Sequence, residues 1–181
     1  MSRARTPPAR RADPRPGGAR LSHLDARGRA AMVDVGGKPV TRRVALAEAR
    51  IRLPREVART LRSSGHRTAK GPVFDTAILA GVMAAKRTHE LIPFCHPLGV
   101  ENCRITITHR QGSVVVVRAE VSVHHRTGVE MEALTAACVA ALTVYDMCKA
   151  LSHDIEITAV RLLAKSGGRR TFRRTARRSE R

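Results

Sequence analysis

Alternation of apolar and polar residues predicts the strands of this chain. Residues 44–53 place five apolar side chains on one side: Ala45, Ala47, Ala49, Ile51 and Leu53. A period of two residues is typical of a half-buried strand. Residues 101–109 and 114–123 alternate in the same way on either side of a polar turn at 110–113, so they predict a hairpin. A fourth alternating segment, 154–164, predicts a last strand.

Helical patterns lie between these strands. Pro54 suits the first turn of a short helix that ends near Gly65. After a polar loop at 66–72, Asp75 is a good N-cap for a helix over 76–90. A longer helix runs from about Gly128 or Val129 to Ala150. The order β-α-α-β-β-α-β favours an α+β, ferredoxin-like fold, in which helices pack on one face of an antiparallel sheet.

Composition and charge divide the chain into one domain with two basic tails. The length of 181 residues suits a single domain, and 43% hydrophobic residues suffice for a core. Only four residues are aromatic, so the core must be aliphatic and rich in alanine. The net charge of +19 is concentrated at the ends, with six Arg in residues 1–20 and seven in 169–181. We therefore expect disordered tails at 1–20 and 169–181 around a single catalytic domain at 21–168.

The tails allow two interpretations. They could attract nucleic acid or a membrane surface through counterion release, or they could be solvated extensions. We favour the second, because Phe172 is the only aromatic residue among their arginines.

The cysteines and the apolar segments indicate a reduced, cytoplasmic protein without a membrane partner. The four cysteines form no C-x-x-C pair and have no zinc-type spacing, so we expect free thiols. The N-terminal region lacks the apolar run of a secretory signal. The longest mostly apolar stretch, from Ala133 to Tyr145, is too short to span a bilayer. No cluster of metal-ligating residues and no redox motif is evident in the sequence. We therefore expect no cofactor and no bound metal.

Lysine is scarce enough to be informative. The 34 basic residues comprise 29 arginines and five lysines. Arginine keeps its proton in proteins, whereas lysine exchanges one when its pKa is lowered. Lys149 follows Asp146 by three residues near the end of the long helix, which places both on one face. They could form an ordinary surface ion pair, or a carboxylate and an ammonium that serve as base and acid.

A second group of carboxylates opens the same helix. Glu130 and Glu132 flank Met131 there, and carboxylates at this position also simply complement the helix dipole. Glu130 and Asp146 are 16 residues apart, or roughly 24 Å along a helix at about 1.5 Å per residue. One pocket in a single subunit cannot easily hold both. If both serve one substrate, more than one chain must assemble the pocket.

Three loops add further polar chemistry. His96 lies in the Pro-bounded segment IPFCHPL at 92–98. Lys165 precedes Ser166-Gly167-Gly168, and Lys70 precedes Gly71; glycine allows backbone N–H groups to approach an anion. Together these features favour an enzyme that acts on a phosphorylated small molecule by proton transfers. A non-catalytic nucleotide-binding module is the alternative.

The amino-acid sequences of these segments resemble those of one protein family. MVDV at 32–35, AAKRT at 84–88, IPFCHPL at 92–98, TGVEMEALTA at 127–136, LTVYDMCKA at 142–150 and LLAKSGG at 162–168 occur in the order found in the molybdenum cofactor biosynthesis protein C family. These proteins are cyclic pyranopterin monophosphate synthases. The resemblance covers about residues 21–168. It implies a ferredoxin-like α+β fold and a homo-hexamer built as a trimer of dimers, with active sites at subunit interfaces.

The resemblance also implies a reaction. The substrate would be (8S)-3',8-cyclo-7,8-dihydroguanosine 5'-triphosphate, supplied by a radical GTP cyclase. The products would be cyclic pyranopterin monophosphate and pyrophosphate. The purine ring is opened and rebuilt as a pyranopterin, and a sugar hydroxyl attacks the α-phosphate.

Roles carry over only at matching positions. Asp146 matches the family's essential aspartate, and Lys149 and Lys70 match its catalytic lysines. Lys165 would help to hold the triphosphate. The remaining substrate contacts implied are Phe94, Cys95, His96, Glu130, Met131 and Glu132.

The chain departs from the family pattern at three places. Phe94 stands where Leu is usual, and Pro72 stands where an acidic residue is commoner. His124-His125-Arg126 replaces a smaller stretch that contains glycine.

Overall fold

The computed structural model describes residues 29, 32–110 and 112–175. By its internal contacts the chain divides into Met1–Val33 and Asp34–Arg181, and the fold below is that of the second unit. Its strands are β1 (Thr41–Arg52), β2 (Arg67–Thr68), β3 (Gly71–Pro72), β4 (Asn102–His109), β5 (Val114–His125), β6 (Glu156–Ser166) and β7 (Phe172–Arg173). Its helices are α1 (Arg55–Ser63), α2 (Val73–Lys86), α3 (Thr88–Leu91) and α4 (Glu130–Cys148).

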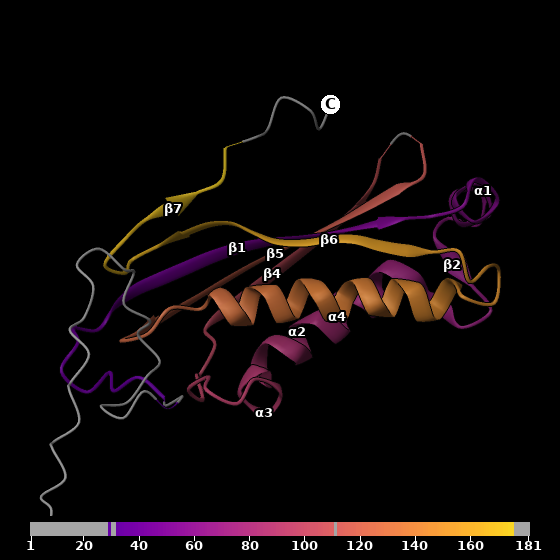
Figure 1. Cartoon of the computed structure of the whole chain (residues 1–181). Coiled ribbons are helices and arrows are strands. Elements are labelled where there is room, and N and C mark those ends of the chain that lie inside the picture. Colours follow the sequence, from indigo (N-terminus) through magenta and orange to yellow (C-terminus); the bar gives the residue numbers. More distant parts are fainter. Residues whose placement is uncertain (1–28, 30–31, 111, 176–181) are drawn as a thin grey trace, which may run out of the picture. The chain divides into compact units, whose positions relative to one another are not determined.

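Five strands form one antiparallel sheet in the order β4-β5-β1-β6-β7. The hairpin β4–β5 lies beside β1, and β6 lies on the other side of β1. The first connection crosses from β1 to β4 through α2, and the second crosses from β5 to β6 through α4. This order of four long strands confirms the expected α+β, ferredoxin-like fold (Figure 1).

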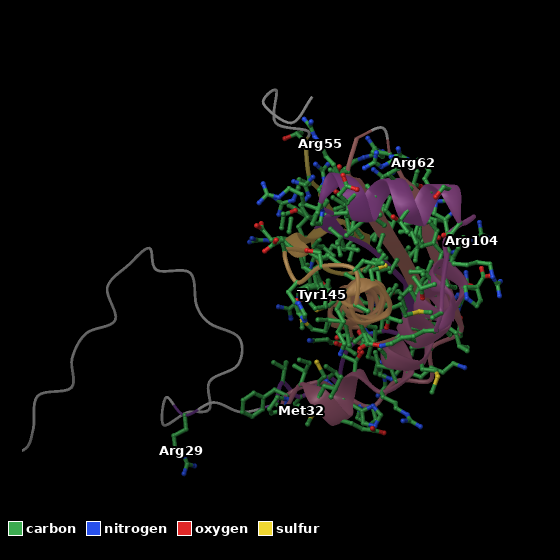
Figure 2. The ribbon with its side chains drawn as sticks, turned by 90° about the vertical axis from the view of Figure 1, so that its right-hand side faces the viewer. Arg29, Met32, Arg55, Arg62, Arg104 and Tyr145 are labelled. Atoms are coloured by element: carbon green, nitrogen blue, oxygen red, sulfur yellow. The ribbon has the colours of Figure 1, made fainter. Side chains whose placement is uncertain are left out.

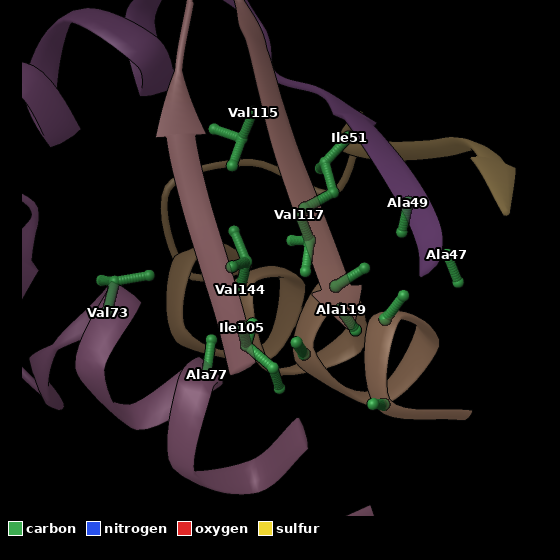
Figure 3. Close-up of a cluster of buried hydrophobic side chains, with 14 of the residues drawn as sticks. Ala47, Ala49, Ile51, Val73, Ala77, Ile105, Val115, Val117, Ala119 and Val144 are labelled. Carbon is green, nitrogen blue, oxygen red and sulfur yellow. The ribbon is translucent and has the colours of Figure 1, made fainter. Parts of the chain in front are cut away.

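The helices α2 and α4 lie on the same face of this sheet (Figure 1). The predicted alternation of β1 is confirmed, because Ala45, Ala47, Ala49, Ile51 and Leu53 are each at most 2% exposed. They join side chains from β4, β5, α2 and α4 in one aliphatic core (Figure 3). Small residues let the two helices approach closely. A Cβ at Gly81 of α2 would lie only 2.8 Å from the carbonyl oxygen of Ala136 in α4.

Helix α4 is the central helix of the domain. Its length and apolar composition alone would suit a membrane span, but 56% of that window is buried in the fold. It packs against β1, β5, β6 and α2, which is the behaviour of a core helix. Because α4 runs from Glu130 to Cys148, both carboxylate groups singled out in the sequence belong to one continuous helix.

The helix expected at 76–90 begins earlier and is interrupted. It starts at Val73, directly after Pro72, and the backbone N–H of Val73 donates to the carbonyl of His66 (2.9 Å). Asp75 therefore lies in the first turn and is not the N-cap. Arg87, with φ −115°, separates α2 from α3. The loop expected at 66–72 contains the two-residue strands β2 and β3.

The C-terminal segment differs from the expected tail in part. Phe172 and Arg173, which we expected to be disordered, pair with Lys165 and Ala164 as β7. Arg174 fixes this strand, since its backbone N–H donates to Leu163 O (2.7 Å) and its Nε to Leu162 O (3.0 Å). The expected tail at 1–20 and residues 176–181 lie outside the described residues.

Candidate active site

Asp146 sits between two lysines at the C-terminal end of α4. Its Oδ1 is 2.8 Å from Lys149 Nζ, and its Oδ2 is 2.7 Å from Lys70 Nζ. Lys70 Nζ also donates to the backbone carbonyl of Asp146 at 3.0 Å. The three side chains are about half exposed. The structure thus brings together the three residues expected to be catalytic, although Lys70 is 76 positions away from Asp146.

The charges of this Lys70–Asp146–Lys149 cluster reinforce one another. Hydrogen bonds from Lys149 and Lys70 lower the pKa of Asp146 to about 2, and Asp146 in turn raises the pKa of Lys149. At neutral pH the carboxylate is therefore ionised and Lys149 carries its proton. The arrangement holds transferable protons on an amine, beside a fixed negative charge.

A short hairpin positions Lys70. The strands β2 and β3 flank the turn that contains it, and Gly71 adopts φ +113°, a conformation that favours glycine. His66, at the base of the hairpin, stacks on Phe74 of α2 with ring centroids 4.3 Å apart. The stack and the bond from Val73 to His66 anchor the hairpin to the core helix, so Lys70 has a rigid support.

Glu130 and Lys165 meet at the other end of α4. Lys165 Nζ lies 2.6 Å from Glu130 Oε1, and about two thirds of each side chain is buried. Lys165 lies near the end of β6, just before the turn at Gly167 and Gly168. An ammonium and a carboxylate expected to contact substrate are therefore paired with each other in this chain.

Glu132 is almost fully enclosed. It is 4% exposed, and burial together with the charge of Glu130 raises its pKa to about 7. The thiol of Cys95 lies close enough that burial and the charge of Glu132 raise its pKa as well. Glu132 therefore loses its proton closer to neutral pH than an unburied glutamate does. Glu130, Glu132, Lys165 and Cys95 form the Glu130–Lys165 cluster.

The other expected contact residues present apolar or aromatic surface. Phe94 is 44% exposed and Met131 is 36% exposed. His96 is partly buried in the segment that follows α3. Exposed apolar side chains beside ionisable groups can pack against the planar ring of a ligand. A purely hydrophilic surface would offer no such contact.

The two clusters lie at opposite ends of α4. Figure 1 shows α4 running along the sheet, with β2 near one end and the turn between β6 and β7 near the other. With Glu130 and Asp146 in one helix, roughly 24 Å separates their backbones at about 1.5 Å per residue. The structure therefore does not bring the two clusters together within one chain.

A large concavity lies on another face of the sheet. It has a volume of about 1140 Å³ and lines the sheet face opposite α2 and α4, between Glu48, Arg118, Arg161 and β7. Of the residues expected at the site, only Lys165 borders it. Glu48 is 1% exposed there; burial alone would raise its pKa, but hydrogen bonds from Arg50, Arg118 and Arg161 outweigh this and lower it. This concavity is distinct from the Lys70–Asp146–Lys149 cluster.

Sequence reasoning missed one buried residue beside the Glu130–Lys165 cluster. Arg43 is only 8% exposed and lies against Gly168. Nothing distinguishes it among the 29 arginines of the sequence, except its position two residues before Ala45. That position belongs to the buried face of β1. A charged residue at a buried strand position was the available signal.

Comparison with known proteins gives a consistent result. A model of the MoaC family matches residues 32–168. The chain is 59% identical to the cyclic pyranopterin monophosphate synthase of Xanthomonas oryzae pv. oryzae over 84% of this chain and 92% of that protein. It is 51% identical to the protein of the same name from Thermomicrobium roseum, over 86% and 94%. It is 51% identical to molybdenum cofactor biosynthesis protein 1 of Drosophila melanogaster, over 85% of this chain and 27% of that protein.

Proposed function

The chain belongs to the MoaC family, and we propose that it is a cyclic pyranopterin monophosphate synthase, a lyase of molybdenum cofactor biosynthesis. It converts (8S)-3',8-cyclo-7,8-dihydroguanosine 5'-triphosphate, supplied by a radical GTP cyclase, into cyclic pyranopterin monophosphate and pyrophosphate. The observation that carries the proposal is the Lys70–Asp146–Lys149 cluster, in which two amines share one carboxylate. Such a cluster suits a reaction made of proton transfers.

The amines supply the first protons. Lys149 is protonated in the resting site because Asp146 raises its pKa. During ring opening, Lys149 and Lys70 donate protons to the purine-derived leaving nitrogens. When one amine becomes neutral, Asp146 loses an adjacent positive charge, and its pKa rises from about 2 towards its ordinary value. The carboxylate can then act as general acid and base in later steps.

The Glu130–Lys165 cluster serves the phosphates and the ring. A sugar hydroxyl attacks the α-phosphate, a new P–O bond forms, and the bond to the β-phosphate breaks as pyrophosphate leaves. Lys165 neutralises charge on the triphosphate once the nucleotide displaces Glu130 from it. Glu132, with a pKa of about 7, can exchange a proton at neutral pH. The walls of the substrate pocket are formed by four further residues: Phe94, Cys95, His96 and Met131.

A complete site needs two subunits. The clusters stand about 24 Å apart along α4, which is too far for one nucleotide-sized pocket within a chain. We propose a homo-hexamer, built as a trimer of dimers, in which the Lys70–Asp146–Lys149 cluster of one subunit faces the Glu130–Lys165 cluster of another. We also propose that the enzyme is cytoplasmic, where its nucleotide-derived substrate would be made.

Turnover of the cyclised substrate tests the function. We expect the full-length protein to release pyrophosphate in a coupled assay and to yield a pterin that fluoresces after oxidation. Asp146→Asn and Lys149→Ala should abolish both signals while the circular dichroism spectrum is kept. Asp154→Asn and Arg104→Ala, which change exposed charges elsewhere, serve as matched controls and should retain the activity. Absence of both products with wild-type protein and verified substrate would refute the proposed function.

A further inference from the structure

Arg43 places a guanidinium inside the domain. Successive side chains of a strand point to opposite faces, so Arg43 shares the helix-covered face of β1 with Ala45 and Ala47. It is 8% exposed. A buried cation is unfavourable unless its donors are used, so its contacts indicate what the arginine is there to do.

Two of these contacts fix the segment that leads into α4. Arg43 Nε donates to the carbonyl of His125 at 3.1 Å, and Nη2 donates to the carbonyl of Arg126 at 3.2 Å. Both acceptors lie just before α4, which begins with Glu130. The planar guanidinium can satisfy two neighbouring carbonyls at once, which the single ammonium of a lysine cannot do in the same geometry.

A third contact reaches the turn after β6. A Cβ at Gly168 would lie 2.8 Å from Arg43 Nη1, so the guanidinium packs against this glycine. The same turn is tied to β1 by Thr41, whose Oγ1 donates to Gly167 O at 2.7 Å. Gly167 adopts φ +85° and packs against the carbonyl of Arg42. Arg43 therefore contacts both segments that flank the Glu130–Lys165 pair.

We propose that Arg43 is a positioning residue that holds the start of α4 and the Gly167–Gly168 turn together, and thereby sets the geometry of Glu130 and Lys165. The role in catalysis rests on the proposed function; the structural coupling does not. Because Lys165 is the residue assigned to the triphosphate, loss of Arg43 should weaken substrate binding more than the chemical step.

Steady-state kinetics of the full-length protein test the catalytic role. We expect Arg43→Met to raise KM about tenfold or more and to change kcat less, since displacement of a positioned group weakens what it binds. Arg43→Lys should have an intermediate KM. Arg55→Met removes an arginine from the surface of α1 (Figure 2) and should match the wild type. A KM for Arg43→Met equal to that of Arg55→Met would overturn the proposal.

A double-mutant cycle separates positioning from general destabilisation. If Arg43 acts through Lys165, the effect of Arg43→Met on KM should be small in a Lys165→Met background. Fully multiplicative effects would overturn the proposal. Gly168→Ala changes no charge but crowds Arg43 Nη1; it should raise KM in the same direction as Arg43→Met if the contact matters.

Backbone amide exchange provides a test that needs no substrate. In Arg43→Met, amides in 126–130 and 166–168 should exchange at least several times faster than in the wild type and in Arg55→Met. Unchanged exchange would overturn the proposal even if the enzyme is active. If the wild type shows no turnover, the proposed function fails and this measurement alone decides whether Arg43 couples the two segments.

Discussion

Replacing Glu132 by Gln should stabilise the protein at alkaline pH and leave its stability nearly unchanged in acid. Burial and the charge of Glu130 raise the pKa of Glu132 to about 7, from 4.5 for an unburied side chain. The folded state therefore holds a proton that the unfolded chain releases at lower pH. This contribution to stability is complete below pH 4.5 and is lost as the pH rises through 7.

The magnitude follows from the two pKa values. At about 1.4 kcal/mol per pH unit, the interval from 4.5 to about 7 corresponds to roughly 3 kcal/mol of destabilisation at high pH. Glutamine does not titrate and has nearly the same shape as protonated glutamate. Glu132→Gln should therefore be more stable than the wild type by up to roughly 3 kcal/mol at pH 8.5, or roughly 6–12 °C in Tm. At pH 5 the difference should be near zero.

Thermal unfolding of the full-length protein at pH 5 and pH 8.5 measures this difference. Glu120→Gln, at an exposed position of β5, is the matched control and should shift Tm little at either pH. Equal shifts for Glu132→Gln at both values would refute the reasoning, because a packing effect would not depend on pH. A lower Tm at pH 8.5 would show that the ionised carboxylate has a partner that offsets its burial.

Three further predictions concern the sheet and the packing of the helices. Gly81→Ala should lower the free energy of unfolding by about 1–3 kcal/mol, because its Cβ would lie 2.5 Å from Ile105 Cδ1; an unchanged urea midpoint would contradict this. Glu48→Gln should cost roughly 3–5 kcal/mol in chemical denaturation, since Arg50, Arg118 and Arg161 each lose their ion pair with this buried carboxylate; a cost under about 1 kcal/mol would argue against the network. Burial and the charges of Arg62 and His66 lower the pKa of His109. The contribution of His109 to stability should be complete above pH 6.5 and decline in more acidic solution. His109→Gln should flatten that decline. If the variant loses as much stability between neutral and acidic pH as the wild type does, this role of His109 is ruled out.

Local patterns predicted most of the fold. The alternation in β1 identified its buried face because every second residue there lies in the core that β1 shares with α4 and the other elements. The same logic failed for β7, whose pairing with β6 depends on backbone hydrogen bonds and on Arg174 contacts with Leu162 and Leu163. The interruption at Arg87 was also missed, because apolar and helix-forming residues continue on both sides.

The candidate site was less accessible to local reasoning. Asp146 and Lys149 are one helical turn apart, so their contact follows from spacing. Lys70 reaches Asp146 only through the tertiary position of the β2–β3 hairpin. The residue pattern marked Lys70 as part of a loop suited to an anion, and only the family resemblance gave it a catalytic role beside Asp146. The pairing of Glu130 with Lys165 likewise joins α4 to β6, and no periodicity along the chain encodes such a contact.

Subunit complementation tests most directly whether each active site joins the two clusters across an interface. Lys149→Ala and Lys165→Ala each damage one cluster. At a substrate concentration near the wild-type KM, Lys149→Ala alone should be nearly inactive, and Lys165→Ala alone should be slow because it binds substrate weakly. Co-assembled in equal amounts, they should regain about a quarter of the wild-type rate, since random mixing places two intact clusters at about one site in four. Mixed assemblies that stay inactive, although both variants are shown to be present in the same particle, would contradict the account.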